Sequence, residues 1–391
     1  MRPPCRSPFF SLVAPFVALG CASEPLDSAA GDEGAGGNAG EGSDGPPKPV
    51  LATTSVVFGP SGTLQPTALA FHPIRADELW VTLRQPATDQ PCTSTEDAGC
   101  RALIGWIAIV SNADEAPDAQ VKTDANGWHF LRRPTSIAFA EDGSFATCAE
   151  ARTSNYEDEA ADFNGPVRWS SDVTLFGAPG QGETNSTHID MLHETPFCMG
   201  LANEGGTIYW AFNGQVGSLD RYDFHEPHGP GEDDHSDGEV WRYATGEVSR
   251  LAGVPSHLAY DAERDELFVA DTGHGRVIAL DATSGSYGEP IFSYDPIETR
   301  AEMIGASVRE VVPPGTLVAP SGLVLDEGRL FVSDHATGHI HAFDRDGALL
   351  ADIDTGRGPN DVSGIAIGPA GRLYFASAAS GEIHRIEEPV P

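Results

Sequence analysis

The sequence predicts an all-β fold made of six similar sheets, and two observations carry this prediction. One sequence pattern recurs six times: it begins with small residues and continues with a short apolar strand, an acidic or glycine turn, and a second apolar strand. The copies themselves show no helical period. Repeats of ~40–50 residues with this character are typical of blades in a ring, so the predicted architecture is a six-bladed β-propeller. The copies begin at Pro66, Pro134, Phe197, Pro255, Pro320 and Val362.

The two strands of each copy differ in a way that places them in a blade. The first strand alternates apolar and small residues, as at Leu69 and Phe71, and a period of two residues indicates a β-strand. Small residues such as Gly200 suit an innermost strand, where strands crowd around an axis. The second strand is more uniformly apolar, as at 267–269 and 330–332, which is expected for a strand buried on both faces.

The two ends of the repeat region predict how the ring closes. The last copy has only three strands before Pro391, whereas residues 53–58 form a lone apolar strand without a blade. We expect this N-terminal strand to supply the outer strand of the last blade and seal its edge. A separate long insertion carries the one helix-like stretch, Glu298 to Val308, which we expect to pack on the surface.

Charge excludes some classes of partner. The 391 residues include 58 acidic and 23 basic side chains, for a net charge of -35. Such a surface repels nucleic acid and attracts cations, including divalent metal ions, although it also serves solubility alone. No Gly-x-Ser-x-Gly elbow, phosphate loop or dinucleotide fingerprint occurs.

The N-terminus resembles a bacterial lipoprotein signal. Arg2 and Arg6 precede an apolar run, Phe9 to Leu19, that is too short to span a bilayer and ends near Cys21. The resemblance implies that residues 1–20 are removed and that Cys21 is lipidated. The chain is then anchored in the cell envelope, at the outer membrane or the periplasmic face, or is secreted if the lipid is absent.

The rest of the chain divides into two parts. Residues 21–50 are acidic, rich in glycine and nearly free of large apolar side chains, so they predict a flexible tether. Residues 51–391 hold the repeats and predict one propeller domain, which we expect to be monomeric.

Four cysteines follow the export signal and the lipidation site, an even number that predicts disulfide bonds in an oxidising compartment. Four cysteines allow three pairings. The short polar loop between Cys92 and Cys100 favours that pair, which leaves Cys148 for Cys198.

Two of the copies carry a family resemblance. LFVADTGHGRVIALD, from Leu267, and LFVSDHATGHIHAFD, from Leu330, resemble NHL-repeat propellers. The resemblance covers roughly residues 55–390 and is strongest in the fourth and fifth blades. It implies a fold similar to that of peptide α-amidating lyases and, more distantly, calcium-dependent lactonases. Because one propeller fold hosts both binding proteins and enzymes, the resemblance implies no chemistry by itself.

One loop predicts a metal site. The segment DFHEPHGPGEDDHSDGE, from Asp223, combines imidazoles and carboxylates, which are ligands for divalent ions such as zinc, copper, nickel, manganese or calcium. The alternative is a solvated acidic loop between the third and fourth strands of blade three. The candidate ligands are His225, His228, Asp233, Asp234, His235 and Asp237.

A second constellation is expected at the mouth of the central channel. Loops that lead into first strands carry His129, His193 and His257, and second strands end near Asp271 and Asp334. We expect these imidazoles, which come from different blades, to be able to meet at one axial ion, and the amidating lyases use a His-lined zinc centre of this general kind. The alternative is a set of ordinary polar residues that line a wet channel.

Two functions are compatible with these features. The first is an exported surface lipoprotein whose propeller binds a divalent metal and a peptide, small molecule or protein. The alternative is a metal-dependent lyase or lactonase at the channel mouth, where the metal polarises a carbonyl or activates water. In that case Glu150 or His335 is the general base and Arg152 clamps a substrate carboxylate. The enzyme requires at least three ligands to converge at the mouth.

Overall fold

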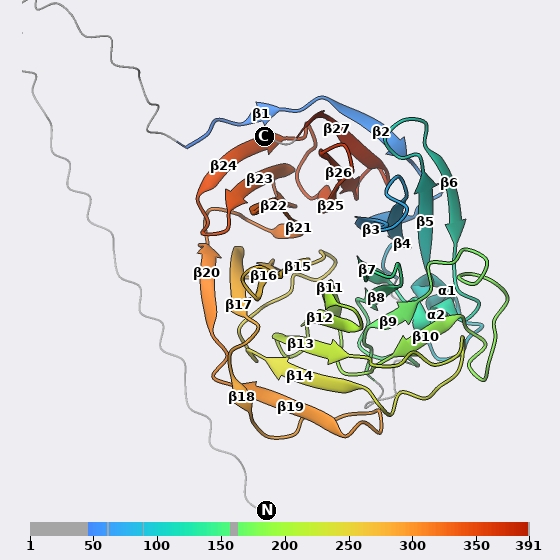
Figure 1. The fold of residues 1–391 in the computed structure, drawn as a ribbon. Helices are drawn as coiled ribbons and strands as arrows, with labels where there is room; N and C mark the ends of the chain where they lie inside the picture. Colours follow the sequence, from blue (N-terminus) through green and yellow to red (C-terminus); the bar gives the residue numbers. More distant parts are fainter. Residues whose placement is uncertain (1–45, 61, 89, 157–162, 390–391) are drawn as a thin grey trace, which may run out of the picture. The chain divides into compact units, whose positions relative to one another are not determined.

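A computed structural model describes residues 46–60, 62–88, 90–156 and 163–389. These residues form six β-sheets arranged in a ring, which confirms the predicted six-bladed propeller (Figure 1). Each innermost strand contacts the innermost strands of both neighbouring blades, so the ring is continuous. In chain order the innermost strands are β3 (Gln65–Phe71), β7 (Pro134–Phe139), β11 (Cys198–Gly205), β15 (Leu258–Asp261), β21 (Pro320–Asp326) and β25 (Val362–Ile367).

The first three blades run outward from these strands. Blade 1 continues with β4 (Leu79–Arg84), β5 (Gly105–Ser111) and β6 (Asp118–Lys122). Blade 2 continues with β8 (Phe145–Ala149), β9 (Val167–Trp169) and β10 (His188–Met191). Blade 3 continues with β12 (Ile208–Asn213), β13 (Ser218–Asp223), β14 (Glu239–Tyr243), β19 (Thr299–Ile304) and β18 (Ser286–Tyr287). Two short helices, α1 (Ala98–Leu103) and α2 (Gly127–Phe130), lie in connections of blades 1 and 2.

The last three blades follow the same plan with different outer strands. Blade 4 adds β16 (Glu266–Asp271), β17 (Arg276–Asp281) and β20 (Val308–Val312). Blade 5 adds β22 (Arg329–Asp334), β23 (His339–Asp344), β24 (Leu349–Asp354) and β1 (Val50–Leu51). Blade 6 adds β26 (Arg372–Ser377), β27 (Ile383–Pro389) and β2 (Thr54–Phe58).

The N-terminal strand closes the ring as predicted. Strand β2 pairs antiparallel with β27, with Thr54 opposite Ile386, and Glu387 N–H donates to Thr53 O at 2.9 Å. The structure adds a feature that the sequence did not reveal, because β1 pairs in parallel with β24 of blade 5. The N-terminal segment therefore ties two neighbouring blades together.

The predicted helix at 298–308 is wrong. Residues Thr299–Ile304 form β19, which pairs in parallel with β14, and β20 begins at Val308. Glutamate, alanine and methionine favour a helix locally, but the open edge of β14 offers a full ladder of backbone partners. Tertiary pairing therefore overrides the local preference.

Burial follows the predicted division between strands. Every residue of β4 is buried, and the second strands of blades 4 and 5 are buried except at their first residue. On the innermost strands, close approach between blades demands small residues. A Cβ added at Gly200 would lie 2.0 Å from Ser256 O of the next blade, and one at Gly322 would lie 2.3 Å from Ser363 O. Small side chains therefore let adjacent blades meet at the axis.

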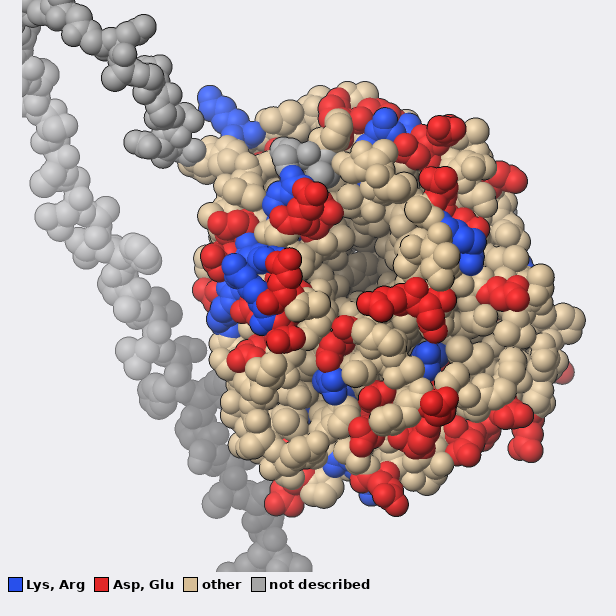
Figure 2. Space-filling view, viewed as in Figure 1, with Lys and Arg blue, Asp and Glu red and all other residues tan. Residues whose placement is uncertain are grey.

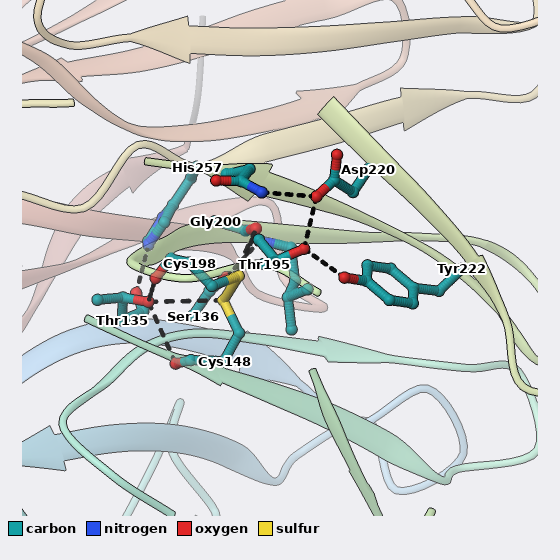
Figure 3. The surroundings of a disulfide bond; sticks show 11 residues. Thr135, Ser136, Cys148, Thr195, Cys198, Gly200, Asp220, Tyr222 and His257 are labelled. Carbon is teal, nitrogen blue, oxygen red and sulfur yellow. Dashed lines mark hydrogen bonds between the residues drawn. A yellow bond between two sulfur atoms is a disulfide. The ribbon is translucent and has the colours of Figure 1, made fainter. Parts of the chain in front are cut away.

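Both favoured disulfides are present. Cys92–Cys100 staples the β4–β5 connection, and Cys148–Cys198 joins β8 of blade 2 to β11 of blade 3. Beside the second bond, Thr135 Oγ1–H donates to Cys198 O at 2.7 Å (Figure 3). This covalent link lies at the inner end of the contact between blades 2 and 3.

The predicted signal peptide, Cys21 and most of the tether lie outside the described residues. Within the described part of the chain, no helix is long and apolar enough to cross a membrane. Acidic side chains are spread over the face shown in Figure 2, which is hollowed at its centre.

Candidate metal centre

Five of the thirteen histidines gather between blades 2 and 3. His188 lies on β10, the outermost strand of blade 2, and His193 follows that strand. His228 and His235 lie on the β13–β14 loop of blade 3, and His129 lies in α2. The ring centroids of His188 and His228 are 4.9 Å apart, and those of His228 and His235 are 5.3 Å apart.

The β13–β14 loop reaches blade 2 because it bonds along the free edge of β10. His228 N–H donates to Ile189 O at 3.1 Å, and Gly231 N–H donates to His188 O at 2.9 Å. Gly231 has a φ of 76°, and a Cβ there would lie 2.0 Å from Gln181 O, so only glycine fits. Backbone bonds therefore fix the two loop imidazoles against the edge strand.

Several imidazole nitrogens of this cluster do not use their hydrogen-bonding capacity. His228 Nδ1 lies 2.7 Å from Gly229 O and must carry the proton, because a carbonyl only accepts. This leaves a lone pair on His228 Nε2. That atom, His235 Nε2 and both ring nitrogens of His188 are buried and have no hydrogen-bond partner among the described residues. Leaving a buried polar atom unpaired costs about 1–3 kcal/mol, so such atoms require an explanation.

The three imidazoles are spaced for one ion. One ligand atom from each of His188, His228 and His235 lies within 4.8 Å of the other two. Two nitrogens bound to one tetrahedral Zn²⁺ at about 2.1 Å lie about 3.4 Å apart. A small inward movement of the side chains would therefore bring the three nitrogens to the spacing of ligands on one ion.

The carboxylate of Asp295 contacts two histidines of the cluster on the side away from the three convergent nitrogens. Asp295, from the β18–β19 connection, accepts from His193 N at 2.7 Å and from His193 Nδ1 at 2.9 Å, and lies 3.5 Å from His235 Nδ1. Burial opposes the charged carboxylate, but these histidine contacts outweigh it and lower the pKa of Asp295. A carboxylate on the far nitrogen directs His235 Nε2 toward the other two imidazoles, as in histidine-bound metal sites.

Burial favours the neutral form of His188, His228 and His129, and the neutral imidazole is the form that binds metals. Burial, reinforced by the neighbouring His228 and His235, lowers the pKa of His188 to about 2. Burial also lowers the pKa of His228, and lowers the pKa of His129 to about 3.

The remaining ligand candidates of the loop lie outside this trio. His225 Nε2 lies 3.2 Å from Glu239 in a more exposed group with Asp223. Asp234 accepts from Ser236 within the loop, and Asp237 accepts from Glu226 N. Asp233 is 64% exposed, and its carboxylate lies 3.9 Å from His235 Nε2.

The sequence did not identify two members of the cluster. His188 stands alone in a short strand, and Asp295 lies in the insertion assigned to the surface. The structure also joins two constellations that the sequence treated separately, because His193 of the channel set approaches His235 of the loop set. No local spacing signals these contacts, since the ligands come from two blades.

Near the axis, the channel candidates have partners of their own. His257 Nε2–H donates to Thr135 O at 3.0 Å across the ring (Figure 3), and His335 Nδ1–H donates to Val362 O at 2.9 Å. Asp271 accepts from Ser249 N at 2.8 Å. Asp334 accepts from the backbone N–H groups of 318 and 319 at 2.9 Å.

The catalytic candidates are also engaged. Glu150 lies 3.0 Å from Arg84 and 3.3 Å from both Arg133 and Arg250, and it accepts from Gly253 N at 2.7 Å. The Arg152 guanidinium lies 5.3 Å from the Phe163 ring centroid. Among the described residues, no group of three convergent metal-ligand atoms includes His257, His335, Glu150, Asp271 or Asp334.

The fold and this geometry define the chain as a six-bladed β-propeller with a candidate metal centre between two blades. No protein-family model and no curated protein sequence matches it.

Several solved structures are similar to this chain over most of its length. A structural genomics protein of unknown function from Bacteroides thetaiotaomicron has a TM-score of 0.50 at 12% identity, over 85% of this chain and 74% of that one. Calcium-binding regucalcin from Agrobacterium tumefaciens has a TM-score of 0.48 at 12% identity, and the match covers 87% of this chain and 97% of that one. A streptogramin B lyase has a TM-score of 0.45 at 10% identity, and the match covers 85% of this chain and 99% of that one. At these identities the likeness concerns the fold alone.

Proposed function

We propose that this propeller is a metal-binding protein that holds one divalent transition-metal ion on His188, His228 and His235. The observation that carries the proposal is a set of buried ring nitrogens that converge from two blades and have no hydrogen-bond partner in the described part of the chain. An ion at their centre would bind one ring nitrogen of each of the three imidazoles.

The donor set favours some metals over others. Three imidazole ligands suit zinc, copper or nickel, whereas calcium requires six or more oxygen ligands. Zinc or copper is therefore the better candidate, and calcium the poorer one. Three protein ligands leave a fourth coordination position for water or another donor.

The role that fits this position is binding rather than catalysis. His188 and His235 are 0% and 5% exposed, so the ion would lie inside the seam between blades 2 and 3. It would join the β13–β14 loop of blade 3 to the edge of blade 2. The lyase or lactonase alternative requires ligands that converge at the channel mouth, and the described residues there bond to backbone or arginine groups instead.

The setting of this function comes from the sequence. The signal-like N-terminus, Cys21 and the glycine-rich segment support a lipoprotein displayed in the cell envelope, and the repeats of blades 4 and 5 support an NHL-like origin. The channel mouth then remains available for a second ligand.

The test is metal content and affinity of the purified protein. Zn²⁺ should bind at one ion per chain, and His188→Ala or His228→Ala should weaken binding by about 100-fold or more, since each removes one ligand. His225→Ala is the matched control, because His225 lies on the same loop but outside the trio. Equal metal content in all four proteins would rule out this centre. Loss in His225→Ala alone would favour the loop-only ligand set.

A further inference from the structure

Blade 5 carries another group of metal-ligand side chains, on strands β23 and β24 (Figure 1). Within the repeat sequence HIHAFD, strand β23 places His339 and His341 two residues apart, so both side chains lie on the same face of the blade. On the neighbouring strand β24, Asp352 lies directly opposite His341. Backbone pairing therefore brings two imidazoles and one carboxylate together.

The distances within this group are close to those of ligands on one ion. Asp352 Oδ1 lies 2.7 Å from His339 Nδ1 and 3.6 Å from His341 Nδ1. The two imidazole rings are stacked, with centroids 5.9 Å apart. Two ligand atoms bound to one tetrahedral Zn²⁺ lie about 3.4 Å apart, a value between the two measured distances. Small side-chain adjustments would place all three groups on a single ion.

The ligand atoms of this group are not used by other parts of the protein. Among the described residues, the Asp352 carboxylate accepts only from His339 Nδ1, and the His341 ring makes no hydrogen bond. His339 Nδ1 must carry the proton of its bond, because a carboxylate only accepts. An incoming metal ion would release this proton to solvent and keep both groups as ligands. The one contact that the ion replaces therefore lies inside the site.

Further negative charge surrounds the two imidazoles. Asp334 on β22 and Asp354 on β24 both lie opposite His339. Their carboxylates accept from backbone N–H groups, including that of Gly356 for Asp354, at 2.9 Å. In the described part of the chain, Asp352 is the one carboxylate of the three without a backbone donor. Two carboxylates are thus fixed as neighbouring negative charges that favour a cation, and the third is left as a ligand.

Solvent reaches this group, unlike the proposed centre between blades 2 and 3. The side chains of His339, His341 and Asp352 are 25%, 14% and 14% exposed. Partial burial still lowers the pKa of His341, which favours the neutral imidazole. An ion held here would keep coordination positions that water or a dissolved ligand can occupy.

We propose that His339, His341 and Asp352 bind a second divalent transition-metal ion, whose remaining coordination positions face solvent. Two imidazoles and one carboxylate suit zinc, copper, nickel or iron, whereas calcium requires six or more oxygen ligands. This ion should bind more weakly than the ion of the buried centre, because it must displace a hydrogen-bonded proton. The site goes beyond the buried centre and does not depend on it.

Calorimetric titration with Zn²⁺ tests the proposal in a variant with His188→Ala and His228→Ala, which lacks two ligands of the buried centre. This variant should still bind one ion per chain. Adding His341→Asn, or Asp352→Asn in its place, should weaken that binding by about tenfold or more, since either change removes one ligand.

His274→Asn is the matched control. His274 Nδ1 lies 2.8 Å from Asp271 Oδ2, nearly the distance in the His339–Asp352 pair, but in the described part of the chain this pair belongs to no group of three ligands. Zn²⁺ affinity should therefore be unchanged by this substitution.

Three results would overturn the site. These are no binding of Zn²⁺ by the doubly substituted variant up to about 1 mM, equal affinity after His341→Asn and His274→Asn, or loss of the ion after His225→Ala but not after His341→Asn. The last result would place the ion beside Asp223 and Glu239.

Titration of the parent protein separates this proposal from the buried centre. The parent should bind one ion tightly and a second more weakly, and His341→Asn should remove only the weaker one. A parent protein that binds the weaker ion alone would contradict the buried centre and leave the blade 5 site standing. A parent that binds only the tighter ion would do the reverse.

Discussion

Buried histidines lie at both ends of the contact between blades 2 and 3. The two ends differ in whether the ring nitrogens of these histidines have hydrogen-bond partners. At the inner end, near the axis, the Cys148–Cys198 bond joins the blades and His257 donates to Thr135 O. At the outer end, nitrogens of His188, His228 and His235 are buried without described partners. Histidine alone does not mark a metal site. The unused hydrogen-bonding capacity of the convergent group at the outer end is what supports the metal site that we propose there.

The largest expected effect comes from breaking the inner end. Replacing Cys148 and Cys198 with alanine should lower the free energy of unfolding by about 4 kcal/mol, since the bond closes a long loop. The two cysteines are 50 residues apart, whereas Cys92 and Cys100 are 8 apart, so the same change there should cost only about 2.5 kcal/mol. Urea unfolding of both variants measures the difference. An equal or larger cost for the short loop would contradict this account of the inner end.

His257 should make the inner end sensitive to acid. Burial lowers its pKa from 6.5 to about 4, so between these values the unfolded chain binds a proton that the folded chain does not. Stability from this group is therefore present above pH 6.5 and is lost as the pH falls toward 4, by roughly 3 kcal/mol in all. In His257→Gln, this part of the acid-induced loss should disappear. Unfolding curves at several pH values measure it, and an unchanged pH dependence in the variant would show that His257 is not responsible.

The two ends also differ in how far the sequence could predict them. Period-two strands, the missing fourth strand of the last copy and the Cys92–Cys100 spacing are local signals, and the ring, its closure and both disulfides followed from them. The proposed metal centre is non-local, because His188 and Asp295 come from different blades and lie in no motif. Which nitrogen is free depends on Gly229 O and on Asp295, contacts that exist only after folding. A non-local contact also explains why the helix predicted at 298–308 is wrong, because pairing with the edge of β14 makes residues 299–304 a strand.

The outer end should depend on metal where the inner end does not. At a free Zn²⁺ concentration of about 100 times Kd, binding to the folded chain alone should raise the free energy of unfolding by about 2.7 kcal/mol. The gain should vanish in His235→Ala, which removes a ligand at the seam, and persist in His257→Gln, whose imidazole faces Thr135 at the axis. Chemical unfolding with and without Zn²⁺ measures both variants against the parent protein. A gain that survives in His235→Ala but not in His257→Gln would reverse the assignment, because the ion would then be held near the axis rather than at the edge of β10.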